Sequence, residues 1–346
     1  MRKGTLRVLV FHPMNDYTGS TRVLATVIED EYRDQEVAVL SNFKDGGFLS
    51  ELKNVKRISF WAPEFRGKWI PIITTLVSRV HLILLSLWHG WRYDVFYINT
   101  FRPDYGAIVG RLYGKKIIYH IHEKYLYPNL GQRFSEYVFN HSKAKKIFVS
   151  EYLMNKYPQL PGSDYVVKYN RLSKSFIADV KIKPISERER KNILFIGALC
   201  LSKGVDKLVP LSKALPQYSF HCVFSVEKEQ IIDYFGNDLP KNLKLYPKQS
   251  NIHPFMEKAD LMINLTNPVY SVETFGMTIL EAMAYGIPSV VPNEGGPIEL
   301  VVNGYNGYCV DTTDLGLIKV HILKAMKESE YERLCENTIK QFEKFK

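Results

Sequence analysis

The sequence predicts an α/β protein with two domains, each built on a parallel β-sheet. Short apolar runs of strand length alternate with segments of helical spacing along the whole chain, which is typical of βαβ units. The chain has 346 residues, enough for two domains that each bury a core. A polar segment without a core pattern, 173–190, is the expected linker. We therefore expect a first domain over 1–172, a second over 191–330, and a C-terminal helix over 331–346.

The first domain begins with the apolar run Leu6–Phe11, which predicts a central strand. Gly19-Ser20-Thr21 then lead into an amphipathic helix with Val23, Leu24, Val27 and Ile28 inward. A glycine loop between a strand and a helix N-terminus suits a phosphate group, and a plain strand-to-helix turn is the alternative. Beyond it we expect a short helix at Tyr105–Tyr113 and strands at Glu36–Leu40, Lys56–Trp61, Asp94–Asn99, Lys116–His120, Ile147–Ser150 and Val166–Asn170.

The segment Arg66–Trp88 allows three interpretations. Nineteen mostly apolar residues follow Trp69, close to the length that spans a bilayer, but Arg79 and His81 lie in the middle. Apolar residues recur at helical spacing, which favours a helix packed on a sheet. A helix lying in the membrane plane is the second interpretation, because cations and tryptophans mark the ends of 66–91. A true membrane span is the least favoured.

The second domain begins with the apolar run Lys191–Gly197, which predicts a new buried strand. Further strands are expected at Ser219–Ser225 and Leu243–Tyr246, with a short helix at Phe255–Lys258. From Leu315 to Phe345 the pattern is helical.

The stretch 259–311 is the most informative part of the chain. A buried strand, LMINL, runs into the loop 266–275, and a helix follows that Gly286 ends. Glu273 and Glu281 flank the start of this helix with seven residues between them. Gly276 opens its first turn, so that the backbone N–H groups of Met277 and Thr278 can face an anion. Carboxylates beside amide donors suit a ligand that carries both hydroxyl and phosphate groups.

This stretch resembles the signature of family 4 of the retaining glycosyltransferases, the group 1 glycosyltransferases. The resemblance is carried by the two glutamates and by Phe275-Gly276, Ala282-Met283, Gly286-Ile287-Pro288, Gly295-Gly296 and Gly307 at matching spacing. It implies the GT-B fold, in which two Rossmann-like domains face a cleft, with the last helix crossing back onto the first domain. It also implies metal-independent transfer of a sugar, such as a hexose, from a nucleotide-sugar donor to a hydroxyl, with retained anomeric configuration.

The resemblance also assigns donor-binding roles in the second domain. Glu281 would hold the ribose hydroxyls, and Glu273 would contact the donor sugar. Lys203, with the N–H groups of Gly276, Met277 and Thr278, would stabilise the leaving diphosphate. The family has an arginine where this chain has Ala198, so one bidentate phosphate contact is missing.

In the first domain the resemblance singles out two positions. His122, at the end of a predicted strand, would contact the donor sugar, and Glu123 stands where the family has aspartate. In the family a glycine loop at the position of Gly19 faces the interdomain cleft, so the resemblance makes Gly19 a donor-binding candidate on the domain expected to hold the acceptor.

Two other functions compete with this interpretation. A Rossmann oxidoreductase or epimerase would need G-x-G-x-x-G after a first strand, and neither domain provides it. A non-catalytic nucleotide-sugar-binding protein on the same fold would lose Glu273, Glu281 or Lys203, and all three are present. The chain has no D-x-D triplet and no zinc-ligand spacing, so no metal or other cofactor is expected.

Charge and cysteine content indicate the partners and the compartment. The four cysteines are scattered and no signal-peptide pattern precedes the first strand, so we expect a cytoplasmic protein. The net charge is +10, and its excess lies in residues 1–172. This basic half favours an anionic membrane surface or acceptor over a generic basic surface, and no nucleic-acid motif accompanies it. The resemblance to the glycosyltransferase family implies an acceptor that is a glycan or lipid-linked intermediate of bacterial surface polysaccharide or glycolipid.

Overall fold

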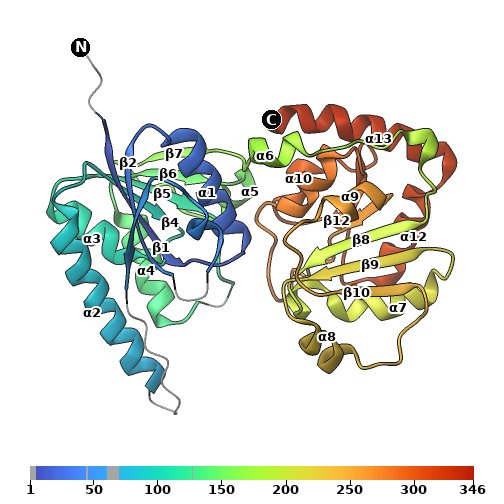
Figure 1. Cartoon of the computed structure of the whole chain (residues 1–346), viewed down its shortest axis with the longest axis horizontal. Helices are drawn as coiled ribbons and strands as arrows, with labels where there is room; N and C mark the ends of the chain where they lie inside the picture. The colour runs from blue at the N-terminus through green and yellow to red at the C-terminus, as the bar shows by residue number, and fades with distance from the viewer. Residues whose placement is uncertain (1–4, 44–45, 61–69, 127) are drawn as a thin grey trace. The chain divides into compact units, whose positions relative to one another are not determined.

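The computed structural model describes residues 5–43, 46–60, 70–126 and 128–346, and the contacts divide the chain into units over residues 1–169 and 170–346. Each unit contains one sheet whose paired strands are all parallel, as the sequence predicted (Figure 1). The segment 173–190, predicted as the linker, lies in the second unit and carries structure of its own: α6 (Lys174–Ala178) and the 3₁₀ turn η2 (Ile185–Glu187).

The sheet of the first unit has the strand order β3-β2-β1-β4-β5-β6-β7. The central strand β1 carries Val8, Leu9, Val10 and Phe11, all at most 1% exposed, because helices cover both faces of the sheet. The strands are β1 (Arg7–Met14), β2 (Glu36–Asn42), β3 (Val55–Ser59), β4 (Val95–Asn99), β5 (Lys116–Ile121), β6 (Lys145–Phe148) and β7 (Asp164–Val167).

The helices of the first unit connect these strands by crossovers in two directions. The chain leaves β1 through α1 toward β2, whereas later crossovers run from β4 toward β7, so the direction reverses between β1 and β4. In open α/β sheets ligands bind at such a switch point, outside the carboxyl ends of the strands. The helical segments are α1 (Gly19–Glu31), η1 (Phe48–Ser50), α2 (Ile70–Gly90), α3 (Asp104–Leu112), α4 (Leu130–His141) and α5 (Glu151–Asn155).

Helix α2 accounts for most of the ambiguous segment 66–91. It is a helix that packs beside α3 in the first unit, while residues 66–69 lie outside the described part of the chain. Within the described residues, no helix combines the length and the apolarity that crossing a bilayer requires.

The sheet of the second unit has the order β10-β9-β8-β11-β12-β13, and its direction reverses between β8 and β11. Its strands are β8 (Asn192–Gly197), β9 (Ser219–Phe224), β10 (Leu243–Tyr246), β11 (Leu261–Ile263), β12 (Ser289–Pro292) and β13 (Gly307–Val310). Its other helical segments are η3 (Leu201–Lys203), η4 (Val205–Lys207), α7 (Leu208–Ala214), α8 (Lys228–Phe235), α9 (His253–Lys258), α10 (Met277–Ala284), α11 (Pro297–Leu300), α12 (Leu315–Ala325), α13 (Glu328–Phe342) and η5 (Glu343–Phe345).

The C-terminal helix α13 packs against α10 and α12 within the second unit. Its inner side carries Tyr331, Leu334 and Cys335, which join the core that also contains Ile193 of β8 and Leu261 of β11. The helical pattern predicted for 315–345 is thus divided into α12 and α13.

Candidate active site

Lys203 and Glu273 meet at the switch point of the second unit. Lys203 ends the turn that follows β8, and Glu273 lies in the loop that follows β11, the neighbouring strand. Lys203 Nζ donates to Glu273 Oε2 at 2.6 Å. Both side chains keep access to solvent, at 32% and 18% exposure, which leaves them available to a ligand. Ala198, at the end of β8, brings no cation to this edge, whereas Lys203 on the same loop does.

The surroundings of Glu273 hold its carboxylate in the charged form. Burial alone would raise its pKa, but the charge and hydrogen bond of Lys203, with hydrogen bonds from the Asn264 side chain and the Phe275 backbone, lower it below the usual value. Burial acts against the Lys203 cation too, and Glu273 nevertheless raises the pKa of Lys203. The site therefore presents a charged carboxylate and a charged ammonium side by side at neutral pH.

The glycines singled out by the sequence let the backbone approach this loop closely. Gly296 donates its N–H to Glu273 O at 2.8 Å. A Cβ atom at Gly296 would lie 2.1 Å from Thr274 O, and one at Gly295, whose φ is +99°, would lie 2.3 Å from Glu273 O. Gly204 is equally confined, because its Cβ would lie 2.1 Å from Leu265 O. These glycines thus hold in place the loops that carry Lys203 and Glu273.

Helix α10 begins directly after the Glu273 loop. Gly276 caps its N-terminus with φ +101°, and the partly exposed Met277 and Thr278 form its first turn. The first N–H groups of a helix lack partners within the helix and attract anions. Glu281 lies one turn further along the same helix and is 2% exposed.

The C-terminus of α10 is closed by a glycine and by a buried arginine. Gly286 N–H donates to Met283 O and Ile287 N–H to Ala282 O, both at 3.0 Å, which is the Schellman arrangement the glycine predicted. Arg188 adds bonds from Nη1 to Gly286 O at 2.8 Å and from Nη2 to Tyr285 O at 2.6 Å. Arg188 was missed at the sequence level because it lies in the polar segment 173–190.

In the first unit His122 lies just beyond β5 and is 8% exposed. Its Nε2 is 2.8 Å from Asn99 Oδ1, at the end of β4, and its ring lies against that of His120 with centroids 4.3 Å apart. Burial lowers the pKa of His122 well below the usual value, and His120 and His12 add to this effect. His122 is therefore a neutral imidazole.

Gly19 is the first residue of α1 and is exposed. The loop before it is arranged around Asp16, whose Oδ1 accepts from Thr18 N at 3.0 Å and from the Thr18 and Thr21 hydroxyls at 2.6 Å. Asn99 connects this loop to His122, because its Nδ2 donates to Ser20 O at 3.4 Å. Ser20, the neighbour of Gly19, and His122 are thus linked through one buried side chain.

Glu123 follows His122 and is partly buried. Burial raises its pKa to about 7, and the charge of Arg102 opposes the shift only in part. This carboxyl therefore titrates near neutral pH.

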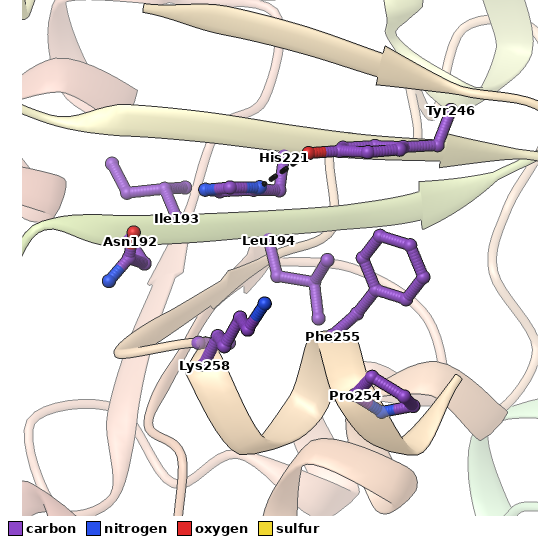
Figure 2. Close-up of a pocket in the computed structure, with 9 residues that line it drawn as sticks. Asn192, Ile193, Leu194, His221, Tyr246, Pro254, Phe255 and Lys258 are labelled. Atoms are coloured by element: carbon purple, nitrogen blue, oxygen red, sulfur yellow. Dashed lines mark hydrogen bonds between the residues drawn. The ribbon is translucent and has the colours of Figure 1, made fainter. Parts of the chain in front are cut away.

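A separate cavity of about 170 Å³ lies in the second unit between α9 and the strands β8, β9 and β10 (Figure 2). His221 stacks on Tyr246 along one side, and Phe255 and Lys258 of α9 lie opposite. None of the predicted site residues lines this cavity. Across the described residues, no group of three or more His, Cys, Asp or Glu side chains is arranged to hold a metal ion.

Comparison with known proteins finds a family match within the second unit. Residues 178–342 match the family model described as glycosyl transferases group 1. An uncharacterized glycosyltransferase of Methanocaldococcus jannaschii is 27% identical over 218 residues, 62% of this chain and 58% of that protein. The match thus spans less than two thirds of this relative's length.

Solved structures show the fold of the whole chain. HepE of Anabaena in complex with UDP-glucose superposes with a TM-score of 0.76 at 19% identity, over 98% of this chain and 95% of that one. WaaG, a glycosyltransferase involved in lipopolysaccharide biosynthesis, superposes with a TM-score of 0.73 at 12% identity, over 98% and 95%. The likeness covers both units and confirms the predicted GT-B fold.

Proposed function

Because residues 178–342 belong to the group 1 glycosyltransferases and the chain has the GT-B fold, we propose that it is an enzyme that transfers a sugar from a nucleotide-sugar donor to a hydroxyl group. The paired Lys203 and Glu273 beside the N-terminus of α10 carry this proposal. A glycosyl transfer requires that negative charge on a departing diphosphate be stabilised. A lysine and the first N–H groups of a helix are the groups that do so.

Glu273 and Glu281 contact two different parts of the donor. Glu273, held charged by Lys203, orients hydroxyls of the transferred sugar and stabilises positive charge that develops at its anomeric carbon. Glu281 accepts from the ribose hydroxyls, as carboxylates do in dinucleotide sites. His122, a neutral imidazole, contacts a hydroxyl of the donor sugar.

The proposed reaction retains the anomeric configuration without a metal. The bond from the anomeric carbon to the diphosphate breaks, and the bond to the acceptor oxygen forms on the same face. The acceptor proton passes to the leaving diphosphate. A carboxylate nucleophile, which a double displacement requires, is not assigned to any residue here.

Donor and acceptor classes follow from the structural relatives. HepE was solved with UDP-glucose, so UDP-sugars are the first donors to test. WaaG acts in lipopolysaccharide biosynthesis, which supports a glycan or lipid-linked acceptor of a bacterial surface polysaccharide or glycolipid.

The test is a screen of nucleotide sugars for hydrolysis and for thermal stabilisation of the full chain, with and without EDTA. We expect turnover of at least one donor, unchanged by EDTA, and α-linked product from an α-linked donor by ¹H NMR. Glu281→Gln should weaken stabilisation by the matching nucleoside diphosphate. Binding without turnover, with any acceptor, would favour the non-catalytic alternative. Absence of both would refute the proposal.

A membrane surface on the first unit is a second part of the proposal. Helices α2, α3 and α4 lie next to one another in contact, and each exposes a stripe of large apolar side chains. Trp88 is 70% exposed, Leu112 70% and Leu130 84%. The stripes consist of Val77, Val80, Leu84, Trp88 and Trp91, then Ile108 and Leu112, then Leu130, Phe134 and Tyr137.

Cations accompany these apolar stripes. Arg92, Arg111 and Arg133 are exposed on or beside the same three helices, and the Arg92 guanidinium lies 5.0 Å from the centre of the Trp91 ring. Apolar side chains flanked by cations suit the surface of a bilayer that contains anionic lipids. We therefore assign this surface to peripheral contact with a membrane that holds the acceptor.

Flotation with phosphatidylglycerol vesicles tests the membrane surface. We expect binding at low salt, weaker binding at 0.5 M salt, and loss of binding in Leu84→Glu/Trp88→Glu. Val320→Glu is the matched control, because Val320 is 55% exposed on α12 of the second unit. Equal binding by both variants, or none by the wild type, would contradict the assignment.

A further inference from the structure

A continuous series of hydrogen bonds runs from His122 into the interior of the first unit. His122 Nε2 lies 2.8 Å from Asn99 Oδ1, and Asn99 Nδ2 lies 3.0 Å from His12 Nδ1. His12 Nε2 lies 2.9 Å from the Thr21 hydroxyl, which donates to Asp16 Oδ1 at 2.6 Å. Asn99, His12 and Thr21 are at most 3% exposed. The members come from β1, the α1 region, β4 and the end of β5, which meet at the switch point of the sheet.

The direction of each bond follows from its two ends. Asn99 also contacts Ser20 O at 3.4 Å, and a carbonyl oxygen only accepts, so the nearby amide atom must be the nitrogen. Asn99 Oδ1 therefore faces His122 and can only accept, which places a proton on His122 Nε2.

The other end is determined in the same way. Asp16 Oδ1 accepts the single proton of the Thr21 hydroxyl, so Thr21 must accept from His12 Nε2–H. His12 Nδ1 is then unprotonated and accepts from Asn99 Nδ2–H. The two protons of Asn99 Nδ2 then face His12 Nδ1 and Ser20 O.

We propose that Asn99 and His12 are positioning residues that hold His122 in its Nε2–H tautomer, with Thr21 and Asp16 as the anchor of the series. The remaining nitrogen of His122, Nδ1, then acts only as a hydrogen-bond acceptor. With the tautomer fixed, the ring presents one defined arrangement of donor and acceptor to the place where the donor sugar is proposed to bind. This last step rests on the proposed glycosyl transfer, whereas the tautomer does not.

The surroundings support a neutral series. Burial lowers the pKa of His12 to about 4, although the charge of Asp16 and a backbone hydrogen bond with Met14 act in the opposite direction. The rings of His120 and His122 are in contact, so a proton on His122 would place a cation in a buried cluster of histidines. The tautomer, and not the charge, is therefore what the series sets.

The test combines ¹⁵N NMR of the histidine rings with kinetics of the full chain. Long-range ¹H–¹⁵N spectra of histidine-labelled protein distinguish protonated from unprotonated ring nitrogens, and His12→Gln and His122→Gln assign the signals. In the wild type we expect a proton on Nε2 of both His12 and His122. Asn99→Leu should leave His122 as a mixture of tautomers, and Thr21→Val should disturb His12 first.

Kinetics then separate positioning from folding. With UDP-glucose, or with the best donor of the screen, Asn99→Leu should lower kcat by between about tenfold and a hundredfold with KM changed less than about threefold. Tyr97→Phe is the matched control: it removes the 2.8 Å hydrogen bond to His120 Nδ1, beside the series but outside it. The control should change neither kcat nor the His122 spectrum.

Three results would overturn the proposal. They are a wild-type His122 protonated on Nδ1, an unchanged His122 spectrum in Asn99→Leu, and a loss of kcat in Tyr97→Phe as large as that in Asn99→Leu. If Asn99→Leu does not fold, the wild-type spectrum and Thr21→Val still decide the tautomer. If no nucleotide sugar is turned over, the proposed function fails, and the NMR result stands independently.

Discussion

Lys203 Nζ and Glu273 Oε2 lie 2.6 Å apart at the switch point of the second unit. The two residues are separated by 70 positions in sequence and meet because β8 and β11 are adjacent strands. Each holds the other in its charged form, since Glu273 raises the pKa of Lys203 and Lys203 lowers that of Glu273 against the effect of burial. The pair can thus bind an anionic donor without a change in the protonation of either side chain.

Lys203→Met should weaken binding of a nucleoside diphosphate by about tenfold or more, because a hydrogen bond to a charged group contributes about 1.5–3 kcal/mol. It should also raise the pKa of Glu273, since burial then acts without the opposing cation. Isothermal titration calorimetry with UDP measures the affinity, and ¹³C NMR of the glutamate carboxyls measures the pKa.

The control for this prediction is Lys248→Met. Lys248 forms a 2.7 Å pair with Glu227 in the same unit, but the two side chains are 62% and 58% exposed. Such surface pairs contribute little. Equal loss of affinity in both variants would show that general charge, and not Lys203, attracts the diphosphate.

Gly295→Ala should destabilise the second unit by about 3 kcal/mol, since its Cβ would overlap Glu273 O at 2.3 Å and its φ is positive. Gly304→Ala isolates the cost of positive φ, because Gly304 has φ +76° with open space around its Cβ, and should cost about 1 kcal/mol. Differential scanning calorimetry compares the two. If the variants lose the same stability, the close approach to the Glu273 loop is not what requires glycine.

Backbone features at this edge of the sheet were predictable because their signals are local. Gly286 predicted the end of α10, and the close approach of Gly295 and Gly296 to the Glu273 loop gives a physical reason for two adjacent glycines. Boundaries were less accurate: the strand predicted at 147–150 is β6 (Lys145–Phe148), because the Ser150 hydroxyl accepts from Leu153 N and caps the next helix.

The buried partners of His122 could not be predicted in the same way. His12 and Asn99 are 87 positions apart, and they meet only because β1 pairs with β4. The sequence shows only a histidine and an asparagine at the ends of two apolar runs. That the two side chains meet can be inferred only when the strand order is known. Arg188 was hidden for a related reason, because its partners are backbone carbonyls about 100 positions away.

Arg188→Met should cost the second unit about 3 kcal/mol, since it leaves two carbonyls at the end of α10 without their charged donor. Arg190→Met is the control two positions later: Arg190 pairs with Glu328 at 3.5 Å, and the Glu328 side chain is 85% exposed. The control should stay within about 0.5 kcal/mol of the wild type. Urea unfolding followed by circular dichroism gives both values, and a stable Arg188→Met would show that water replaces the guanidinium at this helix end.

The first unit should lose stability as the pH falls from about 6.5 to 4. Burial lowers the pKa of His12 to about 4 and that of His120 to about 3, and His122 shifts in the same direction. Between these values and the ordinary pKa of histidine, the unfolded chain takes up protons that the folded chain does not. The stabilisation is therefore complete above pH 6.5 and is lost on acidification. His12 alone accounts for about 3 kcal/mol of it.

Glu123 acts in the opposite direction. Its pKa is raised from 4.5 to about 7, so within this range the folded state keeps a proton that the unfolded state has released. The stability that Glu123 contributes therefore falls as the pH rises from 4.5 to 7. Three histidines outweigh one carboxyl, and the net stability should rise from pH 4 to 6.5.

All four tryptophans lie in the first unit, so their fluorescence during urea unfolding reports on that unit alone. His12→Gln should flatten the dependence on pH, while His141→Gln, at an exposed histidine, should leave it unchanged. A dependence that is equally steep in His12→Gln would show that the buried histidines are not its source.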